Sequence, residues 1–240
     1  TKKFFKDRNL TVYSTKTHEG DLRFLILRAC RRTKDFLVNL ITYDYAEETI
    51  NDYANQLKLY FPQVKTFINS FSQKKAQVAF AEDVKVIYGN GHIVEKLKRG
   101  DKEYLFKISP NSFFQTNTLQ SEKLYDTAVE FGDFRKSDNV LDLYCGTGSI
   151  SIYISELVNK VKGVELIDES IVSARENALL NDIDNVDFET LDIKEFLLNF
   201  KEPGYNKVLV DPPRSGLHPD ICEVLSEYKL KKIIYVSCNP

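Results

Sequence analysis

The regular alternation of short apolar runs with amphipathic segments in residues 108–240 most constrains how this chain folds. Near-continuous apolar strands that alternate with helices are typical of a doubly wound, mostly parallel α/β sheet of the Rossmann-like kind. Such a sheet binds its ligands at the carboxyl ends of its strands. The predicted strands are 139–143, 162–166, 186–191, 207–210 and 232–236, and the predicted helices are 119–131, 150–157, 169–181, 193–200 and 219–228.

Residues 1–107 have a different pattern, which predicts a separate and smaller domain. Glu47 to Phe61 has helical spacing and is stopped by Pro62, and strand-like runs lie on both sides of it. Strands, one helix and further strands are typical of a small α+β domain. The predicted strands are 22–28, 36–42, 64–70, 76–81, 84–88, 92–97 and 103–108. We therefore expect two domains, residues 1–107 and residues 108–240.

Charge is divided unequally between these two parts. The formal net charge is −2, but residues 1–107 hold 20 Lys and Arg against 13 Asp and Glu, and residues 108–240 hold 13 against 22. Clustered cations are the usual footprint of nucleic-acid contact, although solvated strands and turns produce the same pattern. The asymmetry favours RNA or DNA as a partner of the first part. The clusters are Lys2, Lys3, Lys6 and Arg8; Arg28, Arg31, Arg32 and Lys34; and Lys96, Lys98, Arg99 and Lys102.

Several classes of protein are disfavoured by composition. No apolar run approaches the roughly 18 residues that a membrane-spanning helix needs, and no basic-then-apolar leader opens the chain. The four cysteines are far apart and form no CxxC pair, so neither a disulfide framework nor a cysteine-ligated metal site is expected. We expect a cytoplasmic protein that has no metal and no membrane partner. The cysteines are Cys30, Cys145, Cys222 and Cys238.

A glycine-containing turn follows the first predicted strand of the second part. Gly146 and Gly148 allow the backbone to turn tightly and to approach a ligand closely. Ser151 stands where a dinucleotide-binding loop has its third glycine. Asp142, four residues before Gly146, would repel a pyrophosphate but suits the ammonium group of an amino acid. The pattern favours S-adenosyl-L-methionine over a nicotinamide dinucleotide.

Two further acids are predicted at the ends of the next two strands. Glu165 ends the second strand, where a carboxylate accepts the hydroxyl groups of a ribose. Asp192 ends the third strand, where it would meet the amino edge of adenine. The alternative is that the glycines only make a turn and the acids only solvate strand ends. Acids at three successive strand ends, together with the glycines, make the cofactor interpretation the stronger one.

The fourth strand is followed by Asp211-Pro212-Pro213-Arg214. Two prolines make a rigid turn, which would project Asp211 and Arg214 toward the methyl group of the cofactor. Enzymes that methylate exocyclic amines usually have an aromatic residue after the two prolines. Arg214 suits a phosphate or carbonyl oxygen instead, so methylation of an RNA base amine is the weaker alternative.

Cys238 follows the fifth strand, where a thiolate would be well placed as a nucleophile. The C5 carbon of a pyrimidine is too weakly nucleophilic to accept a methyl group unaided. Addition of a thiolate at C6 makes the ring an enolate, whose C5 attacks the sulfonium methyl, and a base then removes the C5 proton. An isolated cysteine is more often a small buried hydrophobe, so this assignment depends on the preceding motifs.

Four motifs together resemble the RNA (uracil-5-)-methyltransferase family, whose members modify uridine in tRNA or rRNA. The motifs are Ser109-Pro110-Asn111-Ser112-Phe113-Phe114-Gln115-Thr116-Asn117, Asp142-Leu143-Tyr144-Cys145-Gly146-Thr147-Gly148, Asp211-Pro212-Pro213-Arg214 and Ser237-Cys238-Asn239-Pro240. The resemblance covers roughly residues 20–240 and implies Cys238 as the nucleophile and S-adenosyl-L-methionine as the cofactor. It implies that the cofactor is bound by Gln115, Tyr144, Glu165, Asp192 and Asp211 beside the two glycines, and that Phe113 or Phe114 stacks on an extruded base.

The resemblance also implies parts that these 240 residues do not show. Family members have a proton-abstracting glutamate several tens of residues after the SCNP motif and two further strands, and some have an RNA-binding barrel or an iron–sulfur cluster. Without that base we expect the adduct to form but turnover to be poor. The predicted function is methylation of uridine C5 in structured RNA. An RNA base-amine methyltransferase and a non-catalytic RNA-binding module remain as alternatives.

Overall fold

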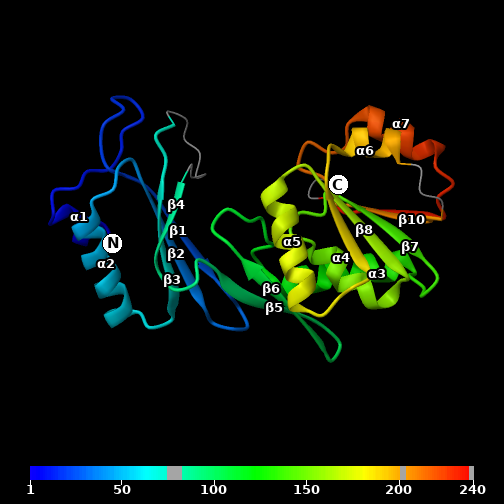
Figure 1. Ribbon diagram of the computed structural model, residues 1–240, viewed down its shortest axis with the longest axis horizontal. Coiled ribbons are helices and arrows are strands. Elements are labelled where there is room, and N and C mark those ends of the chain that lie inside the picture. Colours follow the sequence, from blue (N-terminus) through cyan, green and yellow to red (C-terminus); the bar gives the residue numbers. More distant parts are fainter. Residues whose placement is uncertain (75–82, 201–203, 238–240) are drawn as a thin grey trace. The chain divides into compact units, whose positions relative to one another are not determined.

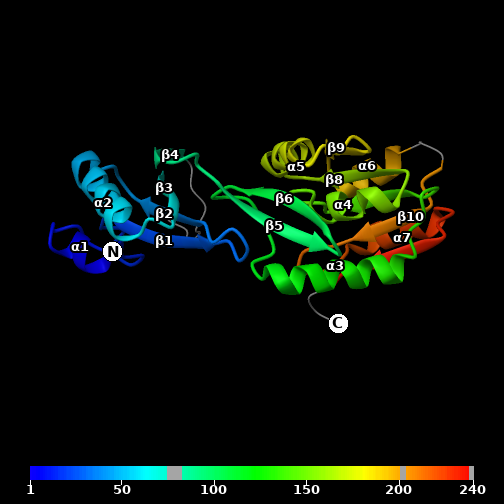
Figure 2. The same cartoon turned by 90° about the horizontal axis from the view of Figure 1, so that it is seen from below.

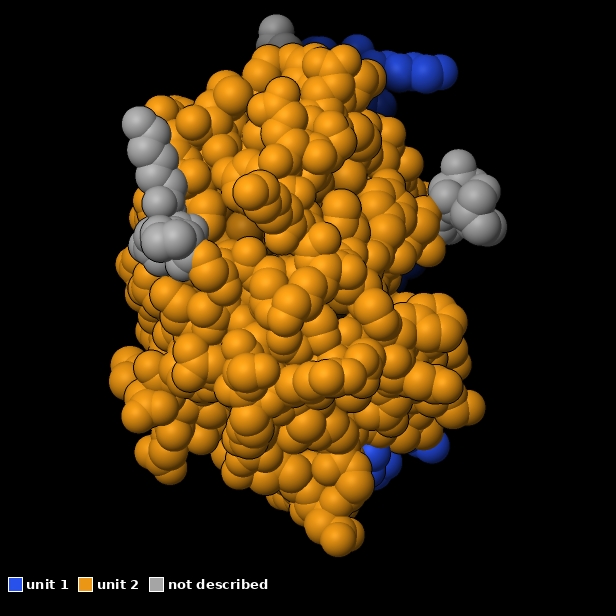
Figure 3. All heavy atoms as spheres, turned by 90° about the vertical axis from the view of Figure 1, so that its right-hand side faces the viewer, with its two compact units in different colours: residues 1–95, 108–111 blue, residues 96–107, 112–240 orange. Residues whose placement is uncertain are grey.

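The computed structural model describes residues 1–74, 83–200 and 204–237, which divide into two units. The first unit holds residues 1–95 and 108–111, and the second holds residues 96–107 and 112–240 (Figure 3). The strand predicted over 76–81 lies outside the described residues, as does Cys238.

The first unit is a mixed four-stranded sheet with helices on one face (Figure 1). Its strands are β1 (Leu22–Ala29), β2 (Phe36–Thr42), β3 (Val64–Phe71) and β4 (Asp83–Tyr88), in spatial order β1-β2-β3-β4. The helix α2 (Glu47–Tyr60) joins the parallel pair β2 and β3, and both edge strands run antiparallel to their neighbours. A short helix that was not predicted, α1 (Lys2–Lys6), buries Phe5 against Tyr53 of α2.

The hairpin of β5 (Ile93–Arg99) and β6 (Lys102–Ile108) belongs for most of its length to the second unit. Asn181 accepts a hydrogen bond from the Leu105 amide at 2.7 Å and donates one to the Leu105 carbonyl at 2.7 Å. Asn177 accepts a hydrogen bond from the Lys107 amide at 2.8 Å. These amide side chains take the place of a neighbouring strand. The division into functional domains after residue 107 stays a prediction.

The second unit confirms the predicted doubly wound fold. Five parallel strands lie in the order β11-β10-β7-β8-β9. Strand order reverses at β7, so the switch point, where such sheets bind ligands, is the carboxyl end of β7. The strands are β7 (Asn139–Leu143), β8 (Lys160–Glu165), β9 (Val186–Thr190), β10 (Lys207–Val210) and β11 (Lys232–Tyr235).

Two layers of helices cover this sheet, because alternate residues of its strands face opposite sides (Figures 1 and 2). Leu141 and Leu143 of β7 pack against α6 (Ile193–Asn199) and α7 (Pro219–Glu227). The other layer contains α3 (Thr118–Gly132), α4 (Ser149–Ile154) with a 3₁₀ turn over Ser155–Leu157, and α5 (Asp168–Leu180). No helix within the described ranges has the length and apolarity to cross a membrane.

Candidate active site

Three left-handed residues turn the chain from β7 into α4. The φ angles are 64° at Tyr144, 53° at Gly146 and 75° at Gly148. A Cβ atom added to Gly148 would lie 2.6 Å from the Phe188 ring, so this glycine is needed for close packing. A Cβ atom added to Gly146 would meet nothing within 4 Å. The turn is therefore packed at Gly148 and open at Gly146.

Glu165, the last residue of β8, lies beside the open glycine. Its Oε2 accepts a hydrogen bond from the Gly146 amide at 3.3 Å. Its Oε1 accepts hydrogen bonds from the amides of Leu166 at 2.8 Å and Ile167 at 3.1 Å. The half-buried carboxylate thus joins the glycine turn to the residues that lead into α5.

Tyr144 and Asp192 lie near the same carboxylate. The Tyr144 ring is half-buried against the layer of α6 and α7. Burial raises its pKa most, and the negative charges of Asp192 and Glu165 raise it further. Asp192 does not end a strand, because β9 stops at Thr190. It is instead the exposed N-cap of α6, where its Oδ1 accepts a hydrogen bond from the Glu195 amide at 3.0 Å.

Asp142 corrects one expectation from the sequence, since its carboxyl group is enclosed by protein and only 1% exposed. Its Oδ2 accepts a hydrogen bond from the Ser151 hydroxyl at 2.5 Å, and its Oδ1 has no partner. Burial raises its pKa to about 7, and the charge of Asp211 contributes. The group therefore supports the glycine turn from the α4 side of the sheet and does not face an open cleft.

The turn after β10 places Asp211 next to the end of β7. The Asp211 amide donates to the Leu143 carbonyl at 3.3 Å, and burial raises the pKa of its side chain to about 6. Burial raises the pKa of Tyr125, and the charges of Asp211 and Asp142 raise it further. The Tyr125 hydroxyl is 2.8 Å from the Ser149 hydroxyl. Arg214 is exposed in the same turn.

The segment Phe113 to Gln115 is tied to the glycine turn, because the Thr147 hydroxyl donates to the Phe113 carbonyl at 3.3 Å. The Phe113 side chain is 68% exposed. Phe114 is only 7% exposed, and its ring lies 5.6 Å from that of Phe106. Of the two candidate stacking residues, Phe114 is thus a core residue and Phe113 alone offers a ring. Gln115 is half-buried.

The described chain reaches Ser237, one residue before the predicted nucleophile Cys238. Past the end of β11, the Val236 amide still donates to the Val210 carbonyl at 2.8 Å, so the two strands pair to this point. Of the other cysteines, Cys30 and Cys145 are buried and Cys222 is exposed on α7. Within the described ranges, no group of three or more acidic, histidine or cysteine side chains is arranged to hold a metal ion.

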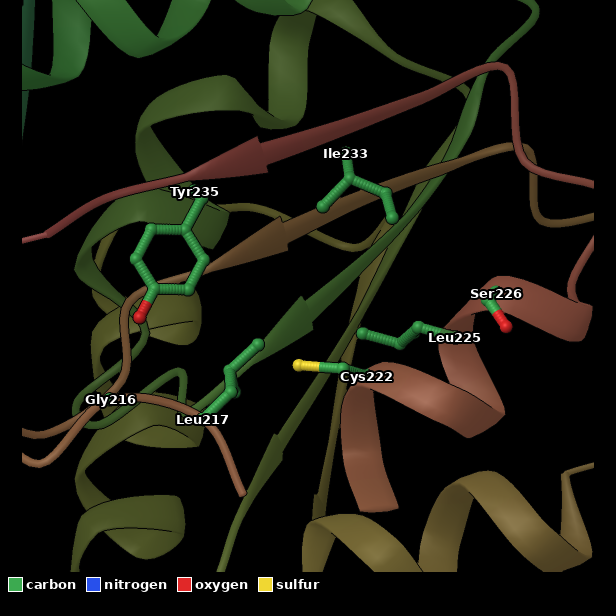
Figure 4. A pocket seen from close by; sticks show the side chains of 7 residues that line it. All are labelled: Gly216, Leu217, Cys222, Leu225, Ser226, Ile233 and Tyr235. Carbon is green, nitrogen blue, oxygen red and sulfur yellow. The ribbon is translucent and has the colours of Figure 1, made fainter. Parts of the chain in front are cut away.

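A cavity of about 520 Å³ that the sequence did not predict lies between β11 and α7 (Figure 4). The signal for it is the alternation of β11, in which Ile233 and Tyr235 are about half exposed on the same side. None of the predicted cofactor residues lines this cavity, but Tyr144 lies close enough to Tyr235 and Cys222 of its lining for their charges to raise the Tyr144 pKa. Its lining consists of Gly216, Leu217, Cys222, Leu225, Ser226, Ile233 and Tyr235.

The curated relatives that match this chain include RNA methyltransferases of several bacteria. An uncharacterized RNA methyltransferase of Oceanobacillus iheyensis is 35% identical over 242 residues, which cover 100% of this chain and 52% of that protein. A similar protein of Chlorobaculum tepidum is 38% identical over 99% of this chain and 49% of its own length. The chain therefore spans about half the length of the curated relatives it matches.

A solved structure gives the same result. The crystal structure of the Pyrococcus abyssi tRNA (uracil-54, C5)-methyltransferase in complex with S-adenosyl-L-homocysteine is similar with a TM-score of 0.81 and 31% identity, covering 100% of this chain and 56% of that one. The family model described as tRNA (Uracil-5-)-methyltransferase matches residues 29–240, well over half of the chain. On this evidence the chain belongs to the tRNA (uracil-5-)-methyltransferase family.

Proposed function

We propose that this chain belongs to an enzyme that uses S-adenosyl-L-methionine to methylate C5 of a uridine in RNA. The proposal rests on one observation: Tyr144, Glu165 and the open turn at Gly146 lie close together at the switch point of the sheet. The family match over residues 29–240 supports it. The S-adenosyl-L-homocysteine in the similar Pyrococcus enzyme supports the choice of cofactor.

The residues at this site fit such a cofactor. The space at Gly146 lets a ligand approach the backbone where a side chain would otherwise stand. The Glu165 carboxylate would hold the ribose hydroxyls, and Asp192 the adenine edge. Asp211, together with Gln115, would face the methionine end. When bound, the cofactor supplies a methyl group on a positively charged sulfur, and acidic groups stabilise positive charge nearby.

The residues of the chain would act on the uridine in a defined order. The Cys238 thiolate adds to C6 of the ring, so a sulfur–carbon bond forms and electron density moves to C5. C5 would then take the methyl group as the sulfur–methyl bond of the donor breaks and leaves a neutral thioether. A base would remove the C5 proton, and the bond between Cys238 and C6 would break to release the thiolate. Phe113, which is exposed, would stack on the extruded base, and Arg214 would contact a carbonyl or phosphate oxygen.

A covalent-trapping experiment tests this proposal. RNA that contains 5-fluorouridine cannot lose the C5 substituent as a proton, so the adduct accumulates and shifts the protein on a denaturing gel. We expect an adduct with S-adenosyl-L-methionine and the parent protein, and none with Cys238→Ala. Cys222→Ala, which removes an exposed cysteine of α7, is the matched control and should behave as the parent does. An adduct that persists in Cys238→Ala contradicts the proposed nucleophile.

Analysis of the methylated product tests the position of methylation. We expect nucleoside digestion of methylated RNA to yield 5-methyluridine. A base methylated on an exocyclic amine would contradict the proposal and support the base-amine alternative. Transcripts of tRNA and of rRNA, tested separately, identify which RNA is the substrate.

A further inference from the structure

The four-residue turn between β1 and β2, Arg31-Arg32-Thr33-Lys34, is fixed to β5 by a buried acid. Glu95 is 1% exposed, and its two carboxylate oxygens accept hydrogen bonds from the backbone amides of Arg31 and Arg32, the latter at 3.1 Å. The Thr33 hydroxyl donates to the Val94 carbonyl at 2.8 Å. A carboxylate is costly to bury unless charge-assisted hydrogen bonds compensate it, as they do here.

The rest of this turn is also constrained. The Cys30 amide donates to the Asp35 carbonyl at 2.9 Å, and the Cys30 side chain is 4% exposed beneath the turn. The backbone of Lys34 is left-handed, with a φ of 64°. Residues other than glycine adopt this conformation uncommonly, and where they do the surrounding structure holds them in it. The backbone of the turn is thus held in place, whereas the side chains of Arg31 and Lys34 are exposed.

The charges of this turn also differ from those of the third basic cluster. Within the described ranges neither Arg31 nor Lys34 forms an ion pair. In contrast, Lys96 and Lys98 of the third basic cluster each lie 2.8 Å from Glu103. Arg28 of the same cluster as the turn has a structural task, because its half-buried guanidinium donates to the Pro110 carbonyl at 2.9 Å.

We propose that Arg31 and Lys34 bind phosphate groups of the RNA backbone and that Glu95 is the positioning residue of this turn. The inference rests on the proposed function for its RNA partner. A rigid turn with two uncompensated cations loses little conformational entropy when it binds an anion. The exposed cations supply the charge, and the buried carboxylate fixes the backbone from which both side chains project.

The salt dependence of RNA binding tests the two cations. A fluorescein-labelled oligouridylate is titrated with the full-length protein, without cofactor, at several salt concentrations. We expect Arg31→Ala/Lys34→Ala to bind more weakly and to lower the slope of log affinity against log salt by about 0.7 for each phosphate that the protein no longer neutralises. Arg135→Ala/Lys136→Ala, which removes two exposed cations before β7, should keep the parent slope. A parent slope in the first variant would overturn the proposal.

Glu95→Gln tests the positioning role, because the charge effect and the loss of positioning change RNA affinity in opposite directions. By charge alone, removal of an acid next to cations strengthens the binding of a polyanion. Loss of the fixed turn instead weakens binding and lowers the salt slope, which is the result we expect. Binding as tight as in the parent would contradict the role of Glu95. These experiments measure RNA binding and not methyl transfer. If the binding results are as expected but the protein methylates no RNA, only the proposed function is contradicted.

Discussion

A buried carboxyl group under the glycine turn makes the stability of the second unit depend on pH. Burial raises the pKa of Asp142 to about 7, far above the roughly 3.9 of an unfolded chain. The folded state therefore binds more protons between these values, so the free energy of unfolding decreases as pH rises from about 4 to about 7. Asp142→Asn should remove this decrease and stabilise the protein at neutral pH by at most about 4 kcal/mol.

Urea unfolding of both proteins at several pH values measures this effect. Asparagine keeps an oxygen for the Ser151 hydroxyl and replaces the unpartnered Oδ1 by an amide group of similar size. Asp184→Asn, which changes an exposed aspartate, is the control and should leave the pH dependence of the parent unchanged. If Asp142→Asn has the same pH dependence as the parent, this carboxyl group is not the source.

The two glycines of the turn should respond differently to the same substitution. Gly146→Ala adds a methyl group in open space, so only the left-handed φ is strained, at a cost of about 1–2 kcal/mol. Gly148→Ala adds the same strain and an overlap with Phe188, which costs about 1–3 kcal/mol more. Thermal unfolding measures the difference in stability.

Cofactor titration by calorimetry separates the two glycines further. We expect Gly146→Ala to weaken the binding of S-adenosyl-L-methionine at a temperature where the variant is fully folded, because the added methyl group occupies the open space of the turn. Equal stability of the two alanine variants, or unchanged cofactor affinity in Gly146→Ala, would contradict this account of the turn.

Sequence patterns predict which residues follow a strand better than they predict what a side chain faces. Glu165 is the last residue of β8, as expected, because the apolar run before it ends there. Asp142 lies within its strand, and only the three-dimensional packing shows that this position faces α4. Similarly, Phe113 and Phe114 are adjacent aromatics in the sequence, and the contact of Phe114 with Phe106 distinguishes them.

At the level of elements, prediction succeeds where an apolar period is long or bounded by polar residues. The bounds of β2, β7 and β10 agree with the sequence pattern without error, and those of α2, α3 and α5 agree within one residue at each end. The helix α1 has only five residues, too few to show a helical period, and it is stabilised by the burial of Phe4 and Phe5. Such a helix depends on tertiary contacts that the local sequence does not contain.

Asn177 of α5 and Asn181, the C-cap of the same helix, hold β6 in place, and their removal should loosen different parts of the unit. Asn177 accepts from the Lys107 amide and donates to the Thr147 carbonyl at 3.1 Å, so it joins β6 to the glycine turn. Asn177→Ala leaves both backbone groups without a partner, at a cost of about 1–3 kcal/mol. We expect faster hydrogen exchange at Lys107 and weaker cofactor binding.

Asn181→Ala, at the C-cap of the same helix, is the matched comparison. It removes both hydrogen bonds to Leu105 but touches no residue of the glycine turn. We expect faster exchange at the Leu105 amide with unchanged cofactor affinity. If both variants lose cofactor affinity equally, the effect comes from the hairpin as a whole and not from the bond to Thr147.

At the scale of the whole chain, the excess of basic residues in the first part is a real property of the sequence, but the cations differ in what they contact. The first and third basic clusters contain ion pairs, such as Arg8 with Asp52 at 3.5 Å and Lys102 with Glu156 at 2.7 Å. Counting charges cannot detect this, because a count does not show which acid lies beside which cation. The net charge therefore overstates how many cations are available to RNA.

Glu103 is the sharpest test of this conclusion. Hydrogen bonds from Lys96 and Lys98 lower the pKa of Glu103 to about 2, so it is ionised and compensates both lysines at neutral pH. Glu103→Gln should remove this compensation from both lysines, tighten oligouridylate binding and steepen its salt dependence. Glu130→Gln, which removes an acid of α3, is the control for the change in net charge alone. Equal effects of the two substitutions would mean that total charge, and not the release of paired lysines, governs RNA binding.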